Sequence, residues 1–251
     1  MVRRAVVPSA SLPDREADVT AQTVPLLRRG GGRATVAAAV LAVVWGTAFA
    51  AEVLPFFPLI VAGGVATGAA GVWVRRGERG WHEGEAERRR FPPFRVTPAH
   101  AALAVAVGVV HLGVGHGLFA LGELLLPELT RTAASVYDRA DSLPLWAAIL
   151  LGGALTASLE EIFWRGAVQP LTISMARDRF PRLAGIPFGP VLFSTVLYTL
   201  FHVATLQLAL IAAAALGGLI WGWLLERTGS VGATMIAHAT WTSLMLVFPP
   251  V

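Results

Sequence analysis

The sequence predicts an all-α protein, a polytopic bundle of about seven to eight transmembrane helices. Hydrophobic residues make up 55% of the 251 residues and charged residues only 14%. The mean hydropathy of +0.63 is high for a soluble domain of this size. The apolar residues also form runs near the length of about 20 that a helix needs to cross a bilayer. Such spans are expected at about 34–52, 56–74, 98–126, 143–174, 188–204, 206–226 and 230–248.

The first 33 residues are polar, rich in glycine and arginine, and mixed in charge. A cleaved signal peptide would show an apolar core of about 7–15 residues after a short basic start, and this segment has none. We therefore expect residues 1–33 to form a disordered cytoplasmic tail. Residues 34–142 should form N-terminal transmembrane helices, because their many alanines and glycines favour close helix packing in lipid.

Arginine supplies all twenty basic residues, and most lie in three clusters: before residue 34, at 75–95 and at 177–182. The positive-inside rule places these clusters, and with them the N-terminus of a multi-pass membrane protein, in the cytoplasm. Acids outnumber arginines at 123–141, so that loop is expected outside. The loop at 75–95 should form a short interfacial helix ended by two prolines. Membrane lipid headgroups explain the basic clusters, and no nucleic-acid partner is expected.

Three histidines, His100, His111 and His116, lie on or beside the third span and were tested as metal ligands. Positions 111 and 116 are about 140° apart on a helix, so these side chains cannot easily share a ligand sphere. We interpret the three as packing or pore-side residues. The chain contains no cysteine, which excludes disulfides, thiolate metal sites and cysteine nucleophiles.

The fourth span, 143–174, carries Glu160, Glu161 and Arg165 in otherwise apolar sequence. Each charge at membrane depth costs at least about 2.5–3.5 kcal/mol, so such residues usually mark a functional site. Glu161 and Arg165 lie four residues apart on one helix face and are expected to form an ion pair. Glu160 points about 100° away and has no local partner. It is therefore the candidate general base or acid.

Two of the later spans each place one histidine deep in apolar sequence, His202 in 188–204 and His238 in 230–248. Each has a hydrogen-bonding residue four positions away, Tyr198 before His202 and Thr242 after His238. At about 1.5 Å per residue, Glu160 and His202 lie about 20 Å and His238 about 12 Å from the cytoplasmic ends of their spans, so the three can meet in the middle or cytoplasmic half of the membrane. The sequence therefore predicts that the three side chains meet in the bundle interior.

This combination resembles the CAAX-protease and bacteriocin-processing (CPBP, or Abi) family of intramembrane proteases. The resemblance covers about residues 143–248, so that 143–251 is expected to be the catalytic transmembrane core. It implies that Glu160 activates water and that Glu161, His202 and His238 complete the site. The residues that carry the pattern are Glu160, Glu161, Arg165, Tyr198, His202, His238 and Thr242.

Two positions depart from the family pattern. Tyr198 stands where phenylalanine is usual, and Thr242 stands where the family typically has asparagine, a residue that this chain lacks entirely. Threonine offers a single donor where asparagine offers two. If this position stabilises an oxyanion, the rate could fall by about 10²–10³.

The resulting hypothesis is an intramembrane endopeptidase that cuts a membrane-associated peptide or protein, with prenylated substrates an open alternative and no oligomeric state predicted. His202 and His238 would orient the attacking water or stabilise the oxyanion. Glu160, His202 and His238 could instead hold zinc, because two histidines and a carboxylate form an accepted catalytic zinc set. The zinc-protease HExxH and serine-hydrolase GxSxG motifs are absent. The alternatives are an inactive membrane partner or immunity protein on the same fold and, with no repeat symmetry to support it, a proton-coupled transporter.

Overall fold

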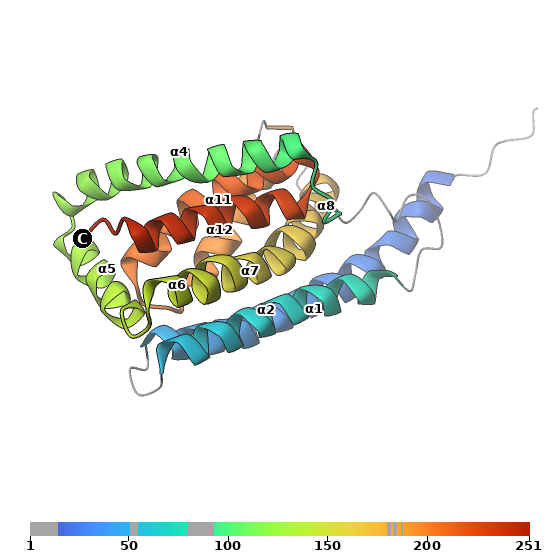
Figure 1. Ribbon diagram of the computed structural model, residues 1–251. Coiled ribbons are helices and arrows are strands. Elements are labelled where there is room, and N and C mark those ends of the chain that lie inside the picture. Colours follow the sequence, from blue (N-terminus) through green and yellow to red (C-terminus); the bar gives the residue numbers. More distant parts are fainter. Residues whose placement is uncertain (1–14, 51–54, 80–92, 180–181, 183–184, 187) are drawn as a thin grey trace, which may run out of the picture.

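The computed structural model describes residues 15–50, 55–79, 93–179, 182, 185–186 and 188–251 (Figure 1). Within these residues every regular element is a helix, which confirms the all-α prediction. In the part of the chain that the structure describes, five helices are long and apolar enough to cross a membrane, and α10 and α12 are shorter apolar helices; together they match the predicted spans. The elements are α1 (Arg15–Ala50), α2 (Phe56–Arg79), α4 (Pro98–Glu123), α5 (Pro127–Ala140), α6 (Leu145–Ala148), η1 (Ile149–Thr156), α7 (Ala157–Phe163), η2 (Trp164–Val168), α8 (Gln169–Arg179), α10 (Gly189–Val203), α11 (Leu208–Thr228) and α12 (Val231–Val247).

The first helix differs from the sequence prediction. α1 begins at Arg15, so residues 15–33 are helical where a disordered tail was expected, and the apolar part of α1 begins at Gly31. Residues 1–14 lie outside the described residues. So does most of the basic loop, at 80–92, and with it the predicted interfacial helix.

One long helix, built from α6, η1, α7, η2 and α8 in succession, carries the acidic pair through the bundle. It contains two π-helical segments, η1 before the glutamates and η2 after them. Such wide turns are uncommon and often lie at functional sites. Pro170 has no N–H to offer the carbonyl of Gly166. The Gly166 carbonyl oxygen instead accepts a hydrogen bond of 2.8 Å from Nη1 of Arg75, which lies on α2.

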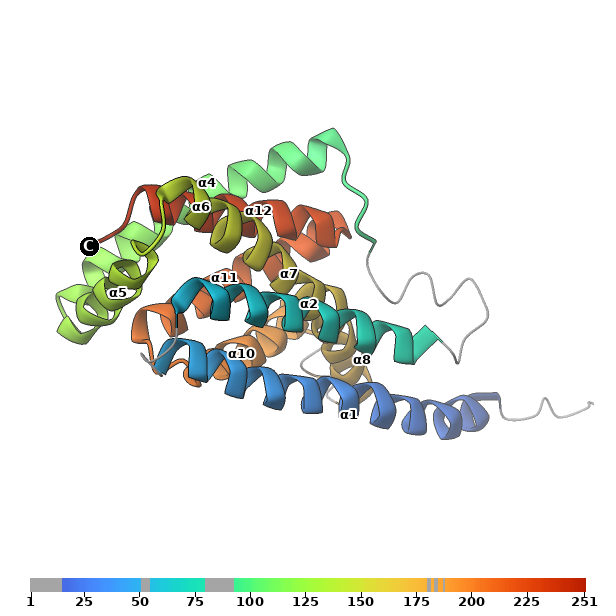
Figure 2. The same ribbon diagram turned by 60° about the horizontal axis from the view of Figure 1, so that its bottom comes forward.

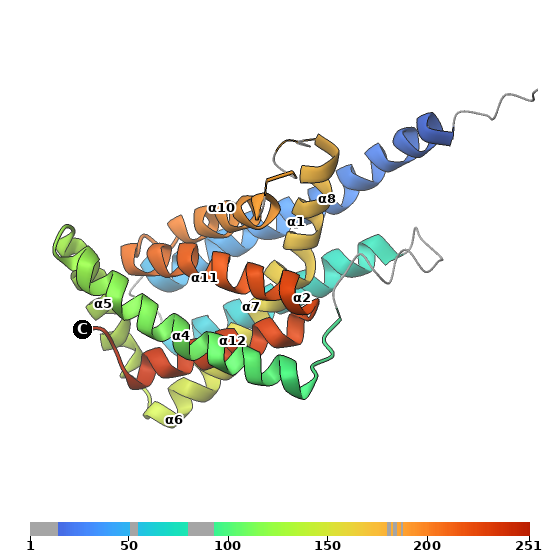
Figure 3. The same cartoon turned by 90° about the horizontal axis from the view of Figure 1, so that it is seen from above.

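The helices pack in pairs around this long helix, as Figures 1 and 2 show. α1 lies along α2, which in turn lies against α7, while α4 packs on α12 and α10 packs on α11 (Figure 3). Glycine permits the closest approaches. A Cβ atom on Gly71 of α2 would lie 2.7 Å from the backbone of Ile162, and one on Gly108 of α4 would lie 2.9 Å from the carbonyl oxygen of Ala237. These contacts fix α7, which carries Glu160, and α12, which carries His238.

The acidic segment at 123–141 is largely helical, because α5 occupies most of it. One face of α5 is buried and includes Leu129 and Ala133. Arg139 ties α5 to the end of α1, where its Nη1 donates to the Phe49 carbonyl at 2.9 Å and its Nη2 to the Ala48 carbonyl. α5 therefore closes the end of the bundle that lies opposite α8 (Figure 1).

Candidate active site

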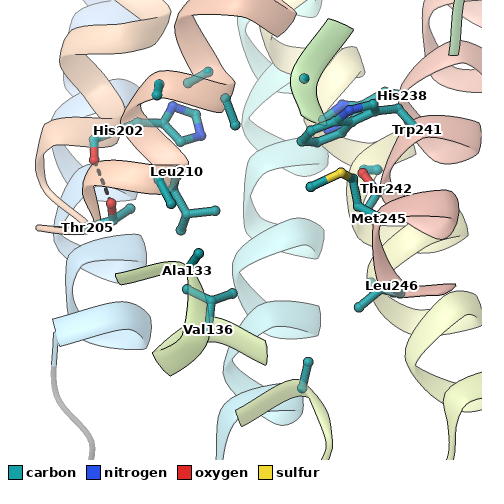
Figure 4. A pocket seen from close by; sticks show the side chains of 18 of the residues that line it. Ala133, Val136, His202, Thr205, Leu210, His238, Trp241, Thr242, Met245 and Leu246 are labelled. Carbon is teal, nitrogen blue, oxygen red and sulfur yellow. Dashed lines mark hydrogen bonds between the residues drawn. The ribbon is translucent and has the colours of Figure 1, made fainter. Parts of the chain in front are cut away.

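A cavity of about 320 Å³ lies among the helices, and the candidate residues from three separate spans line it. Glu160 comes from α7, His202 from α10, and His238 and Thr242 from α12. The two imidazoles face each other from opposite walls of the cavity (Figure 4). Glu161 and Arg165 do not line it. The structure thus brings the predicted residues together in two groups. Glu160, His202, His238 and Thr242 line the cavity, and Glu161 and Arg165 form a supporting pair behind it.

The supporting pair is the ion pair that the sequence predicted. Arg165 Nη1 lies 3.1 Å from Glu161 Oε1, and both side chains are almost completely buried. The same Glu161 oxygen lies 3.0 Å from His238 Nδ1. Arg165 also donates to the Gly217 carbonyl at 3.4 Å. Because Arg165 balances the charge of Glu161, His238 can remain neutral and use its Nδ1–H to bond the carboxylate.

Glu160 is half-buried and lies on the cavity wall, apart from this pair. The hydroxyl group of Tyr198 donates a long hydrogen bond of 3.4 Å to Glu160 Oε2. The Tyr198 ring is held from the other side by Arg165, whose guanidinium carbon lies 4.5 Å from the ring centroid. Glu160 thus keeps a carboxylate oxygen available to a molecule in the cavity.

The protonation of both imidazoles follows from their hydrogen bonds. His202 Nδ1 lies 2.9 Å from the Tyr198 carbonyl oxygen, which can only accept, so Nδ1 carries the proton. Glu161 imposes the same arrangement on His238. In the neutral rings the two Nε2 atoms are therefore hydrogen-bond acceptors. Trp221 stacks on His238 with 3.7 Å between ring centroids, which fixes the plane of that ring.

The remaining cavity wall is mainly apolar and extends toward the end of the bundle that α5 closes. The sequence placed the meeting point in the middle or cytoplasmic half of the membrane. The cavity extends to α5, the segment that the arginine distribution predicts to lie outside, and the depth of the site in the membrane stays a prediction. Its apolar lining includes Phe49, Phe56, Phe57, Leu129, Ala133, Val136, Leu210, Met245 and Leu246.

The zinc alternative does not fit this arrangement. Among the residues that the structure describes, no group of three histidine, aspartate or glutamate side chains is placed to hold a metal ion. Glu160, His202 and His238 share one cavity, yet they stand on different walls and do not form a ligand set.

One residue of the cavity had been assigned only a packing or pore-side role. His111 of α4 is 1% exposed and lines the cavity beside His238. His116, five residues later on α4, does not line the cavity. Its Nδ1 lies 3.0 Å from the carbonyl oxygen of Leu112, and its Nε2 lies 3.0 Å from that of Phe248. The signal for His111 was its position deep in an apolar span, which the sequence alone could not connect to the other two histidines.

Comparison with known proteins supports a peptidase. Residues 142–244 match the family described as "Rce1-like: Type II CAAX prenyl endopeptidase Rce1-like". This match confirms the resemblance to the CAAX-protease and bacteriocin-processing family and covers all the candidate residues from Glu160 to Thr242. No curated protein and no solved structure matched. The chain is accordingly an integral membrane protein with a peptidase-like second half.

Proposed function

We propose that this protein is an intramembrane endopeptidase in which Glu160 activates a water molecule to hydrolyse a peptide bond of a membrane-associated substrate. One observation carries the proposal. Glu160, His202 and His238, from three different spans, line a single cavity within the apolar bundle. Ionisable groups are seldom gathered inside a membrane protein without a function.

In the proposed mechanism, Glu160 accepts a proton from water while the water oxygen attacks the peptide carbonyl carbon. The Nε2 atoms of His202 and His238 accept hydrogen bonds from water and so help to orient it. Glu160 then delivers the proton to the leaving nitrogen as the C–N bond breaks, which yields a carboxylic acid and an amine. Glu161 and Arg165 act from behind the cavity, because they hold the His238 ring and its tautomer.

The substrate class follows from the walls of the cavity. Most of the lining is aromatic or aliphatic, and the polar atoms are concentrated around Glu160 and the histidines. Such a cavity favours an apolar chain beside the scissile bond. We therefore propose a substrate that is itself anchored in the membrane. Peptides with an N-terminal palmitoyl chain and peptides with a farnesylated cysteine followed by three further residues are the two probes that compare an acyl with a prenyl anchor.

The test is cleavage of these peptides by purified protein in liposomes. We expect Glu160→Gln to lower kcat by about 10²–10⁴, the contribution of a positioned general base. Glu226→Gln is the matched control, because Glu226 is an exposed acid of α11 that does not line the cavity, and its activity should equal that of the unchanged protein. Equal cleavage by the unchanged and Glu160→Gln proteins would overturn the mechanism.

A second experiment separates hydrolysis without a metal from metal-dependent hydrolysis. If Glu160 and the two histidines act without a metal, cleavage should continue in the presence of the chelator 1,10-phenanthroline. Cleavage that stops with the chelator and returns with added zinc would replace the proposed mechanism with a metal-dependent one. A correctly folded protein that cuts none of the peptides, together with an unchanged Glu160→Gln variant, would favour the alternative of a non-catalytic membrane partner.

A further inference from the structure

The cavity reaches the surface of the bundle between α4 and α11. Leu118 of α4 and Ala212 of α11 both line the cavity and are both exposed. Leu118 follows His111 by seven residues, so the two side chains lie on the same face of α4. His111 is nevertheless 1% exposed and Leu118 is 52% exposed. The face of α4 that is covered at His111 is therefore uncovered two turns later, where the cavity opens.

Small residues keep this opening free of side chains. Gly115 of α4 lines the cavity, and a Cβ atom there would have one neighbour within 4 Å, Trp241 Nε1 at 3.9 Å. On the other side α11 presents Ala212. α5 contacts both helices and bounds the third side with the buried Leu129. We call the opening between Gly115, Leu118, Ala212 and Leu129 the mouth.

The surroundings of the mouth are apolar on both helices. α4 and α11 are both long and apolar enough to cross a membrane, and Leu118 and Ala212 lie within their apolar stretches. Val114 and Leu121, each within one turn of Leu118, are exposed, and so is Leu219, which lies two turns after Ala212 on the same face of α11. Exposed apolar residues on a membrane span face acyl chains. The mouth therefore connects the cavity with the hydrocarbon part of the bilayer.

An apolar path leads from the mouth to the catalytic groups. Figure 4 shows Met245 and Leu246 on one wall of the cavity and Leu210 on the other. Among the described residues, Glu160 is the only acid in the lining, which includes no arginine. The eight residues from His238 to Leu246 span about 12 Å along α12. A hydrocarbon chain that moves from lipid into this path loses no contact with water, because both environments are apolar.

α5 closes the end of the cavity and is held in place by polar contacts. Arg139 donates to backbone carbonyls at the end of α1. Thr132 Oγ1 accepts a hydrogen bond of 3.2 Å from the backbone at the start of α11, and Ser135 donates to Gln207 Oε1 at 3.3 Å. Entry through this end would require these contacts to break, whereas entry through the mouth requires none of them to break.

We propose that the mouth is the entry and binding site for the hydrocarbon anchor of the substrate, which passes from lipid between α4 and α11 and brings the attached peptide bond beside Glu160. This inference rests on the proposed peptidase function. It assigns separate places to the two parts of an anchored peptide. The hydrocarbon chain contacts Gly115, Leu118 and Ala212, and the polar backbone reaches the groups that carry out hydrolysis.

The kinetic test narrows the mouth with Gly115→Leu. For the palmitoylated peptide in liposomes we expect KM to rise about tenfold or more with kcat little changed, because anchor binding is lost and the chemistry is not. The same peptide without its palmitoyl chain should be cut as by the unchanged protein. Gly113→Leu is the matched control, because Gly113 is exposed on α4, has nothing within 4 Å of its Cβ position, and does not line the cavity.

A second pair of variants tests the mouth from α11. Ala212→Phe should raise KM in the same way, and Leu219→Phe, at an exposed position outside the cavity, should not. Equal KM values in both narrowed variants and their controls would overturn the inference and leave the proposed function intact. A lower kcat on both forms of the peptide, together with a lowered unfolding temperature, would also overturn it and assign Gly115 and Ala212 to packing.

A crosslinking measurement needs no turnover. Glu160→Gln protein in liposomes is exposed to a palmitoylated peptide with a photoreactive diazirine in the middle of its acyl chain. Mass spectrometry should find the chain attached to residues 115–119 and 209–216, and Gly115→Leu should lose these products. Attachment confined to α1, α2 or α5 would overturn the inference.

Two further outcomes of this measurement identify the ligand. A diazirine on a phosphatidylcholine acyl chain that labels the mouth and is not displaced by the peptide would make the mouth a site for bulk lipid, which overturns the inference. Peptide that labels the mouth of a protein that cuts none of the peptides would overturn the proposed function instead, and would leave the mouth as the binding site of an anchored peptide.

Discussion

Removing Arg165 should cost far more stability than removing Arg165 and Glu161 together. The Glu161 side chain is fully buried and depends on Arg165 for a counter-charge. Breaking a buried ion pair on one side costs about 3–5 kcal/mol, because it leaves a charge without compensation. For a chain of 251 residues, each kcal/mol corresponds to about 2–4 °C of unfolding temperature, so Arg165→Met should unfold about 6–20 °C earlier.

The double variant Arg165→Met/Glu161→Gln is the decisive comparison. Methionine can still pack against the Tyr198 and Trp221 rings that the Arg165 guanidinium covers, and glutamine can still accept the hydrogen bond from His238 Nδ1. With no charge left unpaired, we expect the double variant to recover most of the lost unfolding temperature.

The assay is thermal unfolding of purified protein in one detergent, with helicity and tryptophan fluorescence followed on the same sample. A double variant no more stable than Arg165→Met would refute the reasoning, since the cost would then arise from lost packing or from the Gly217 contact. A drop below about 2 °C in Arg165→Met would refute it as well, because Glu161 would then tolerate burial without its partner.

Three further predictions concern positions around the site. Gly71→Ala should destabilise the protein by about 1–3 kcal/mol, because its Cβ would lie 2.7 Å from the Ile162 backbone. The control Gly113→Ala should be neutral or stabilising, because a Cβ there would meet nothing within 4 Å. Thermal unfolding checks both, and a Gly113→Ala protein less stable than Gly71→Ala would contradict the prediction. Arg75→Met should cost about 1–3 kcal/mol in the same assay by removing the donor to the Gly166 carbonyl, while the exposed Arg76→Met should stay within about 0.5 kcal/mol. Tyr198→Phe should lower kcat only about fivefold, since the bond to Glu160 is long at 3.4 Å; a loss above about 100-fold would instead make the hydroxyl group a participant in the reaction.

Local rules explain the parts of the site that were predicted correctly. The Glu161–Arg165 pair depends only on a spacing of four within one helix, and Arg165 lies 3.1 Å from its partner as that spacing requires. The spans were predictable for a similar reason. A lipid environment demands long apolar helices whatever their neighbours are, so composition alone locates them.

Other features depended on contacts between distant segments. α5 was expected as an outer loop, because its sequence is too polar for a span, and it is a helix whose buried face needs α4 and α11 to cover it. The place of His111 in the cavity wall depends on the approach of α4 to α12 at Gly108. The π-helical segments η1 and η2 were not predicted either, because the sequence analysis assumed 3.6 residues per turn throughout the span.

The sequence by itself determined that this is a helical membrane protein and which charged side chains lie within its spans, because the cost of charge and open backbone in lipid acts on each segment separately. Only the tertiary structure decided which of those side chains share a cavity. That outcome depends on how closely helices from both halves of the chain approach one another, and such packing is a property of pairs of surfaces that no single segment encodes.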